Sequence, residues 1–138
     1  LDSSKQEIFN RKLQAKYQKI RENEVRYEAI NCEDAEYLMV AYGSSARICE
    51  KTMELAREKG IKVGLLRPIT LFPFPTEQIK EIGGRMKGIL SVELNAGQMV
   101  NDVRLAVECK VPVEHFGRMG GIIHSPEEVL EALTKIVR

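Results

Sequence analysis

The segment Tyr37–Arg47, which reads YLMVAYGSSAR, restricts the possible folds of this chain more than any other. Its first six residues are apolar or aromatic, and a short apolar run that ends at a glycine is typical of a strand buried on both faces. Gly43 permits a tight turn. Ser44 or Ser45 is expected to cap a following helix, because a hydroxyl oxygen can accept from the free amides of a first helical turn. Strand, turn and helix form the first half of a βαβ unit.

The rest of the chain repeats this alternation. Gly60 is expected to end the first helix, and Thr76 and Ser125 are expected to cap two later ones. Strands that alternate with capped helices indicate a mostly parallel sheet with helices on both faces, a three-layer α/β/α fold. The further strands are predicted at residues 61–66, 88–93 and, short and peripheral, 111–116.

The N-terminal part is predicted to differ from the rest. Residues 1–23 are predicted to form an amphipathic helix with a narrow apolar stripe. It is either a docking helix or a connector from a preceding domain, or else a helix packed on its own sheet. Residues 24–30 alternate polar and apolar side chains, which favours a half-exposed strand at a sheet edge. We therefore divide the chain into a connector helix, 1–23, and an α/β domain, 24–138. The apolar stripe consists of Phe9, Leu13, Tyr17 and Ile20.

Composition excludes several classes of protein. The chain has 138 residues, 43% of them hydrophobic, which suits one domain with a real core. A formal net charge of +1 gives no argument for nucleic acid or membrane binding. Cys32, Cys49 and Cys109 are scattered, as expected for reduced thiols in a cytoplasmic protein. No apolar stretch approaches the roughly 20 residues of a membrane helix. Because the chain starts at Leu1 and not at Met, we expect it to be a piece of a longer protein.

The carboxyl ends of the parallel strands are the expected place for a site, because ligands of such sheets bind at that edge. The helix starts after Gly43 and Ala96 could each hold an anion, although Gly43 lies in no GxGxxG pattern and a plain turn is favoured. Glu93 is either a buried acid with a perturbed pKa or a carboxylate that bonds the amides of the next loop. The candidate residues at this edge are Gly43, Ser44, Ser45, Arg67, Pro68, Glu93, Asn95, Gly97, Gln98, Gly117 and Arg118.

Other chemistry is not favoured. His115 and His124 have no acidic or thiol partner at metal spacing, so we interpret both as structural or surface residues and predict no metal site. A triad of a serine, a histidine and Asp102 lacks the GxSxG elbow. The loop Arg67–Pro75 contains three prolines between apolar residues; the prolines exclude a helix, and we expect the loop to be held against another part of the protein.

Four segments in order resemble one family: VAYGSSAR at 40–47, GLLRPITLFPFP at 64–75, VELNAGQM at 92–99 and FGRMGG at 116–121. The chain resembles the C-terminal region of the alpha subunit of 2-oxoacid:ferredoxin oxidoreductases, nearest the 2-ketoisovalerate type. The resemblance implies the transketolase C-terminal-domain fold, a five-stranded sheet with one antiparallel edge strand. It also implies that strands 37–42 and 88–93 lie side by side.

The family converts a 2-oxoacid and coenzyme A to an acyl-CoA and CO₂. Thiamine diphosphate with Mg²⁺ supplies the carbanion chemistry, and 4Fe–4S clusters pass electrons to ferredoxin. This chain lacks the family's catalytic glutamate, its diphosphate–magnesium motif and its cluster cysteines. The resemblance therefore implies no catalytic residue and no bound cofactor here, but a role in subunit assembly and around the active site.

Two residues are predicted to face a neighbouring domain or subunit: Arg67, in the proline loop, and Gln98, at a helix start. Two other interpretations stay open. The chain could be a stand-alone protein-interaction module, or the C-terminal domain of a thiamine-dependent dehydrogenase or transketolase that uses no ferredoxin.

Overall fold

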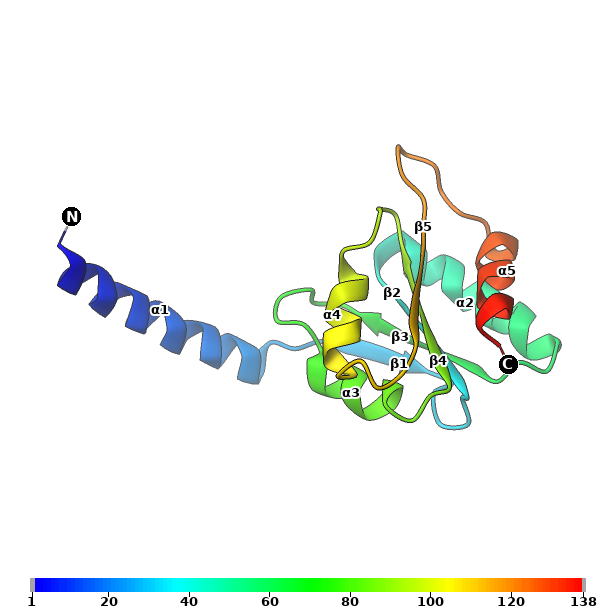
Figure 1. The fold of residues 1–138 in the computed structure, drawn as a ribbon, viewed down its shortest axis with the longest axis horizontal. Helices are drawn as coiled ribbons and strands as arrows, with labels where there is room; N and C mark the ends of the chain where they lie inside the picture. The colour runs from blue at the N-terminus through cyan, green and yellow to red at the C-terminus, as the bar shows by residue number, and fades with distance from the viewer. Residues whose placement is uncertain (1, 138) are drawn as a thin grey trace.

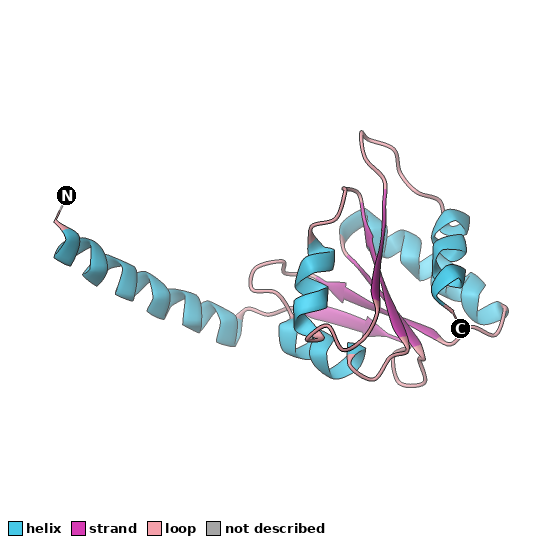
Figure 2. Cartoon of the chain, in the orientation of Figure 1, coloured by secondary structure: helices cyan, strands magenta, loops and turns pink. Residues whose placement is uncertain are grey.

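The computed structural model describes residues 2–137, which form five helices and five strands around one sheet (Figures 1 and 2). The strands are ordered β1-β3-β2-β4-β5 across the sheet. The elements in chain order are α1 (Ser3–Asn23), β1 (Tyr27–Ile30), β2 (Tyr37–Ala41), α2 (Gly43–Glu58), β3 (Val63–Pro68), α3 (Thr76–Gly83), β4 (Gly88–Glu93), α4 (Met99–Ala106), β5 (Val113–Gly117) and α5 (Pro126–Ile136).

The predicted architecture is confirmed. β1 pairs with β3 in antiparallel orientation at one edge, and all other neighbouring strands are parallel. Every residue of β2 and β4 is buried, as their apolar runs predicted. One core cluster lies between the sheet and helices α2 and α5, and the other lies between the sheet and helices α3 and α4, so the molecule has three layers (Figure 1).

Two of the predicted helix caps are wrong. Helix α2 starts at Gly43, one residue before the serines, and its N-cap is Tyr42, which has extended backbone and makes no side-chain cap bond. The reason is that Gly43, at φ +56°, already turns the chain into the helix. Thr76 is likewise the first residue of α3 and not its cap.

The predicted boundary of β3 is shifted by two residues. The strand is predicted at 61–66, but Gly60 N–H and Ile61 N–H donate to the Arg57 and Ala56 carbonyls of α2 and satisfy the end of that helix, so the strand begins at Val63. Gly60 lies just after the helix with φ +80°, as predicted for its C-terminal glycine.

Helix α1 extends away from the sheet as an arm, and none of its side chains is buried (Figure 1). The interpretation that it packs on its own sheet is therefore wrong. Its contacts are with the proline loop: the Tyr17 ring meets Phe72 edge-on at 5.8 Å, and the Arg21 guanidinium lies 6.0 Å from the Phe72 centroid. Among residues 2–137, no helix is long and apolar enough to cross a membrane.

Strand β1 is shorter than the predicted range 24–30. The alternation of polar and apolar residues predicts that one face of the strand is buried, but only Ile30 is even partly buried. Tyr27 and Ala29 are exposed, while Ile30 is partly buried against the α2 side of the core. The exposed pair shares one face of the strand, because side chains alternate along it. Among residues 2–137, no other element buries this face of β1.

The cap of α5 is confirmed as a capping box: the Ser125 hydroxyl accepts from Glu128 N–H, and the Glu128 carboxylate accepts from Ser125 N–H. We expect Ser125→Ala to lower the free energy of unfolding by about 1 kcal/mol. Urea unfolding would measure this, with Ser44→Ala as the control because Ser44 caps nothing. Equal effects of the two substitutions would contradict the assignment.

Candidate functional site

The predicted crevice lies where β2 and β4 run side by side. Their parallel pairing is confirmed, with Ala41 opposite Val92 near their carboxyl ends. The chain leaves β2 toward one face of the sheet, where α2 packs, and leaves β4 toward the other, where α4 packs. This is the topological switch point at which open α/β sheets bind ligands.

Glu93, the last residue of β4, is fully buried, and its carboxylate caps helix α4. Its Oε2 accepts from the backbone N–H groups of Gln98 at 3.1 Å and Met99 at 2.9 Å. Its Oε1 accepts from Val100 N–H at 2.9 Å and from the Ser91 hydroxyl at 3.1 Å. The carboxylate thus binds the free amides of the first turn of α4, so the amides suggested as an anion site after Ala96 are already occupied.

Burial of Glu93 by itself raises the pKa of the carboxyl. The N–H groups of Met99, Gln98 and Val100 favour the ionised form more strongly and hold the pKa below its usual value. Glu93 is therefore a structural anion and not a protonated acid. Features of both interpretations of this residue are present, because Glu93 is buried with a shifted pKa and also bonds the neighbouring loop amides.

Six of the predicted site residues lie together around Glu93, in the loop before α4 and at the end of β5. Asn95 Oδ1 accepts from Gly97 N–H at 2.7 Å, which closes the loop before Gln98. Gly117 is the register partner of Glu93, and Arg118 N–H donates to the Glu93 carbonyl. The six are Glu93, Asn95, Gly97, Gln98, Gly117 and Arg118.

Two histidines stand close to this cluster. His115 on β5 places Nε2 3.9 Å from Glu93 Oε1, too far for a hydrogen bond, and this nitrogen has no partner among residues 2–137. His124 is buried, with its ring edge-on to Phe116 at 5.8 Å. Burial, and secondarily the nearby Arg118 guanidinium, lower the pKa of His124 and keep it neutral.

The remaining candidates follow or end two other strands: Gly43, Ser44 and Ser45 follow β2, beside the end of β4, and Arg67 and Pro68 end β3. Arg67 stands near the end of β3 and pairs through Nη1 with Glu28 of β1 at 3.0 Å. Gly43 and Ser44 are exposed at the start of α2, whereas Ser45 is buried. Within residues 2–137 neither serine hydrogen-bonds a histidine, so the geometry offers no support for a triad.

The described residues do not fit the metal ions and iron–sulfur clusters that the resemblance implies. Among residues 2–137, no group of three or more His, Cys, Asp or Glu is placed to hold a metal ion. Cys32 and Cys49 are buried free thiols, and burial raises the pKa of both. Thiols held neutral are poor ligands for an iron–sulfur cluster.

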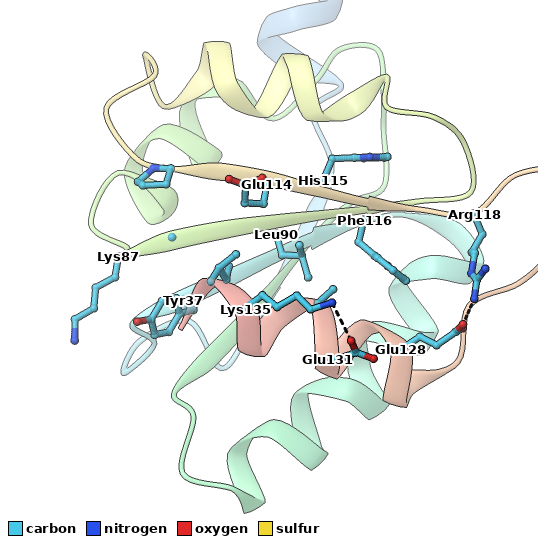
Figure 3. A pocket seen from close by; sticks show the side chains of 14 residues that line it. Tyr37, Lys87, Leu90, Glu114, His115, Phe116, Arg118, Glu128, Glu131 and Lys135 are labelled. Atoms are coloured by element: carbon cyan, nitrogen blue, oxygen red, sulfur yellow. Dashed lines mark hydrogen bonds and ion pairs between the residues drawn. The ribbon is translucent and has the colours of Figure 1, made fainter. Parts of the chain in front are cut away.

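A cavity of about 780 Å³ lies between β5 and α5, and the sequence did not predict it (Figure 3). Leu90 and Phe116 contribute apolar surface to the cavity. Two ion pairs also line it: Glu131 with Lys135, and Arg118 with Glu128. Arg118 alone belongs to the predicted site. The cavity exists because α5 packs mainly against α2 and β4 and less against β5, which no local pattern reveals.

The chain is similar to domains and subunits of known 2-oxoacid oxidoreductases. Residues 35–129 match the family model described as pyruvate:ferredoxin oxidoreductase core domain II. The chain is 48% identical over 136 residues to the ketoisovalerate oxidoreductase subunit VorB of Methanothermobacter thermautotrophicus, covering 99% of this chain but 38% of that protein. It is 35% identical over 106 residues to the 2-oxoglutarate synthase subunit KorA of the same organism, covering 77% of this chain and 28% of that protein.

A solved structure shows the same fold. A 2-oxoglutarate:ferredoxin oxidoreductase from Magnetococcus marinus, with 2-oxoglutarate, coenzyme A and succinyl-CoA bound, superposes with a TM-score of 0.79 and 19% identity. The match covers 98% of this chain and 24% of that chain. The chain thus spans well under half the length of these three proteins.

Proposed function

Because the chain belongs to the pyruvate:ferredoxin oxidoreductase core domain II family, we propose that it is the C-terminal domain of a subunit of a 2-oxoacid:ferredoxin oxidoreductase. The observation that carries the proposal is the 48% identity to a ketoisovalerate oxidoreductase subunit over 99% of the chain. The substrate we propose is accordingly a branched-chain 2-oxoacid, 2-ketoisovalerate.

In the proposed reaction, the bond between the carboxylate and the keto carbon breaks and CO₂ leaves. The acyl carbon forms a thioester with coenzyme A, and the thiol proton is released. The electron pair left by decarboxylation passes, one electron at a time, to two molecules of oxidised ferredoxin. We assign this chemistry to thiamine diphosphate with Mg²⁺ and to 4Fe–4S clusters held in other parts of a cytoplasmic complex, since residues 2–137 include no group placed to hold a metal ion.

This domain would then serve assembly and the surroundings of the active site. Helix α1 would be the connector to the remainder of the subunit, consistent with its position outside the α/β domain (Figure 1). The cluster around Glu93 would form a rigid rim at the carboxyl edge of the sheet, because the carboxylate locks the loop before α4.

The proposal is tested by restoring the complete subunit and co-expressing it with the other subunits of the complex. We expect a brown complex that reduces ferredoxin when 2-ketoisovalerate and coenzyme A are added, faster than with pyruvate or 2-oxoglutarate. A complex with another substrate preference would overturn the choice of 2-oxoacid. A colourless preparation with unrelated partners would favour the stand-alone interaction module, and a colourless thiamine enzyme would favour the ferredoxin-independent class.

Arg67 and Gln98 provide a more local test, because both stand at the carboxyl edge of the sheet that would face a neighbouring domain or subunit. We expect Arg67→Ala and Gln98→Ala each to reduce complex assembly or turnover by roughly threefold to tenfold, the effect of losing one or two interfacial hydrogen bonds. Lys59→Ala, at the opposite end of α2, is the control. Unchanged assembly and turnover in both variants would refute this role.

A further inference from the structure

Helix α1 carries two parallel stripes along its length. Phe9, Leu13, Tyr17 and Ile20 recur every three or four residues and form the apolar stripe. Lys12, Lys16 and Lys19 each precede one residue of that stripe and recur at the same spacing. Since one residue advances a helix by about 100°, the lysines form a second stripe along one flank of the first.

The lysine stripe has no anionic partner within residues 2–137. Two other cations of the helix are satisfied locally, Lys5 by Asp2 and Arg11 by Glu7, but none of the three lysines forms an ion pair. Residues 3–23 contain six basic and two acidic side chains, whereas the formal charge of the whole chain is only +1. Positive charge is therefore concentrated on the arm.

The apolar stripe continues onto the domain. Tyr17 contacts Phe72 of the proline loop, where Ile69 and Leu71 are also exposed. The loop is tied to the start of β1, because Ile69 N–H and Thr70 N–H both donate to the Arg26 carbonyl. The stripe and the loop thus form one continuous apolar surface, with lysines along one side.

We propose that α1 and the proline loop bind a protein surface that has an apolar groove with a row of carboxylates along one border. The proposal rests on the proposed function, because the partner is another part of the same oxidoreductase. Carboxylates at the border would pair with the lysines, and the groove would cover Phe9, Leu13 and Phe72.

The chemistry of the two stripes favours this partner over others. A nucleic acid would leave the apolar stripe in water, and a membrane surface would leave the rigid proline loop only partly buried. A second copy of this chain offers the cavity between β5 and α5. Its carboxylates Glu128 and Glu131 are already paired with Arg118 and Lys135, which leaves Glu114 as the one lining carboxylate without an ion pair in residues 2–137, too few for three lysines. An apolar groove bordered by carboxylates on another protein surface would bury the apolar stripe and pair with the lysines.

The test uses the complete subunit in its assembled complex. Carbodiimide treatment joins a lysine Nζ to a contacting carboxylate, and peptide mass spectrometry identifies the linked residues. We expect links from Lys12, Lys16 or Lys19 to Asp or Glu outside residues 1–138. Hydrogen exchange of the α1 amides is then compared with that of a Lys12→Gln/Lys16→Gln/Lys19→Gln variant. The matched control replaces the exposed lysines Lys51, Lys59 and Lys110 by Gln.

The variant is expected to reduce the protection of α1 about eightfold, because three interfacial ion pairs each contribute a factor of about two. The control should change protection less than twofold. Unchanged protection in the variant, links only to a second copy of this chain, or protection that appears only with phosphatidylserine vesicles would each overturn the docking proposal. If the subunits did not assemble at all, the proposed function would be contradicted. The docking proposal rests on that function and would be contradicted as well.

Discussion

Replacing Glu93 by Ala is expected to lower the free energy of unfolding by about 3–4 kcal/mol, because three backbone N–H groups would lose a charged acceptor in a buried site. Glu93→Gln should cost about 2 kcal/mol, since one amide oxygen still accepts while the NH₂ group faces other donors. Urea unfolding monitored by circular dichroism measures both. Glu114→Ala on the exposed face of β5 is the control and should cost less than about 0.5 kcal/mol.

The same carboxylate predicts a pH dependence with a definite sign. The pKa of Glu93 is lower in the folded protein than its ordinary value of 4.5. Its stabilising contribution is therefore complete above the unfolded-state pKa and is lost as the pH falls through the lower, folded-state pKa. The difference in free energy of unfolding between the native protein and Glu93→Gln should become smaller as the pH is lowered from 7 to 3. A difference that stays constant over this range would show that Glu93 does not cap α4 as an anion.

Replacing Gly117 by Ala is the second substitution expected to have a large effect. A Cβ atom at this position would lie 2.2 Å from the Asn95 carbonyl oxygen and 2.6 Å from Cε1 of the His115 ring. The carbonyl belongs to the backbone and cannot rotate away, so the loop before α4 must move. We expect a loss of about 3 kcal/mol in the free energy of unfolding, at the upper end for overpacked sites.

Gly88→Ala is the matched control for this experiment. It also lies in a parallel strand, but a Cβ atom there would meet its nearest neighbour, the Tyr37 ring, at 3.6 Å, an ordinary contact. Thermal unfolding of the two variants should separate them clearly. If both lost the same stability, the close approach of Gly117 to Asn95 would not be what excludes a side chain there.

The strands were predictable because their local pattern and their environment agree. The apolar run of β4 was assigned to residues 88–93 without error, since a strand between two helical layers needs apolar residues on both faces. The placement of β2 beside β4 came from the family resemblance, because periodicity says nothing about which strands pair.

The N-terminal caps of α2 and α4 could not be predicted from local sequence patterns. Ser44 and Ser45 have the right chemistry for a cap, but the turn at Gly43 starts the helix before either. Glu93 caps α4 from five residues before Gln98, outside any capping pattern, and only the path of the loop brings its carboxylate to the amides. The cavity beside β5 depends on where α5 packs and was equally invisible in the sequence.

The position of β2 at the centre of the sheet has a consequence for synthesis of the protein. β2 leaves the ribosome before both strands that flank it, and each of its residues is apolar. One of its edges can pair only after β3 is made, and the other stays open until residues 88–93 have emerged. Nascent chains that end between these points expose an unpaired apolar edge, the feature that promotes aggregation and chaperone binding. Translation through residues 42–93 is thus the interval in which this fold most needs protection.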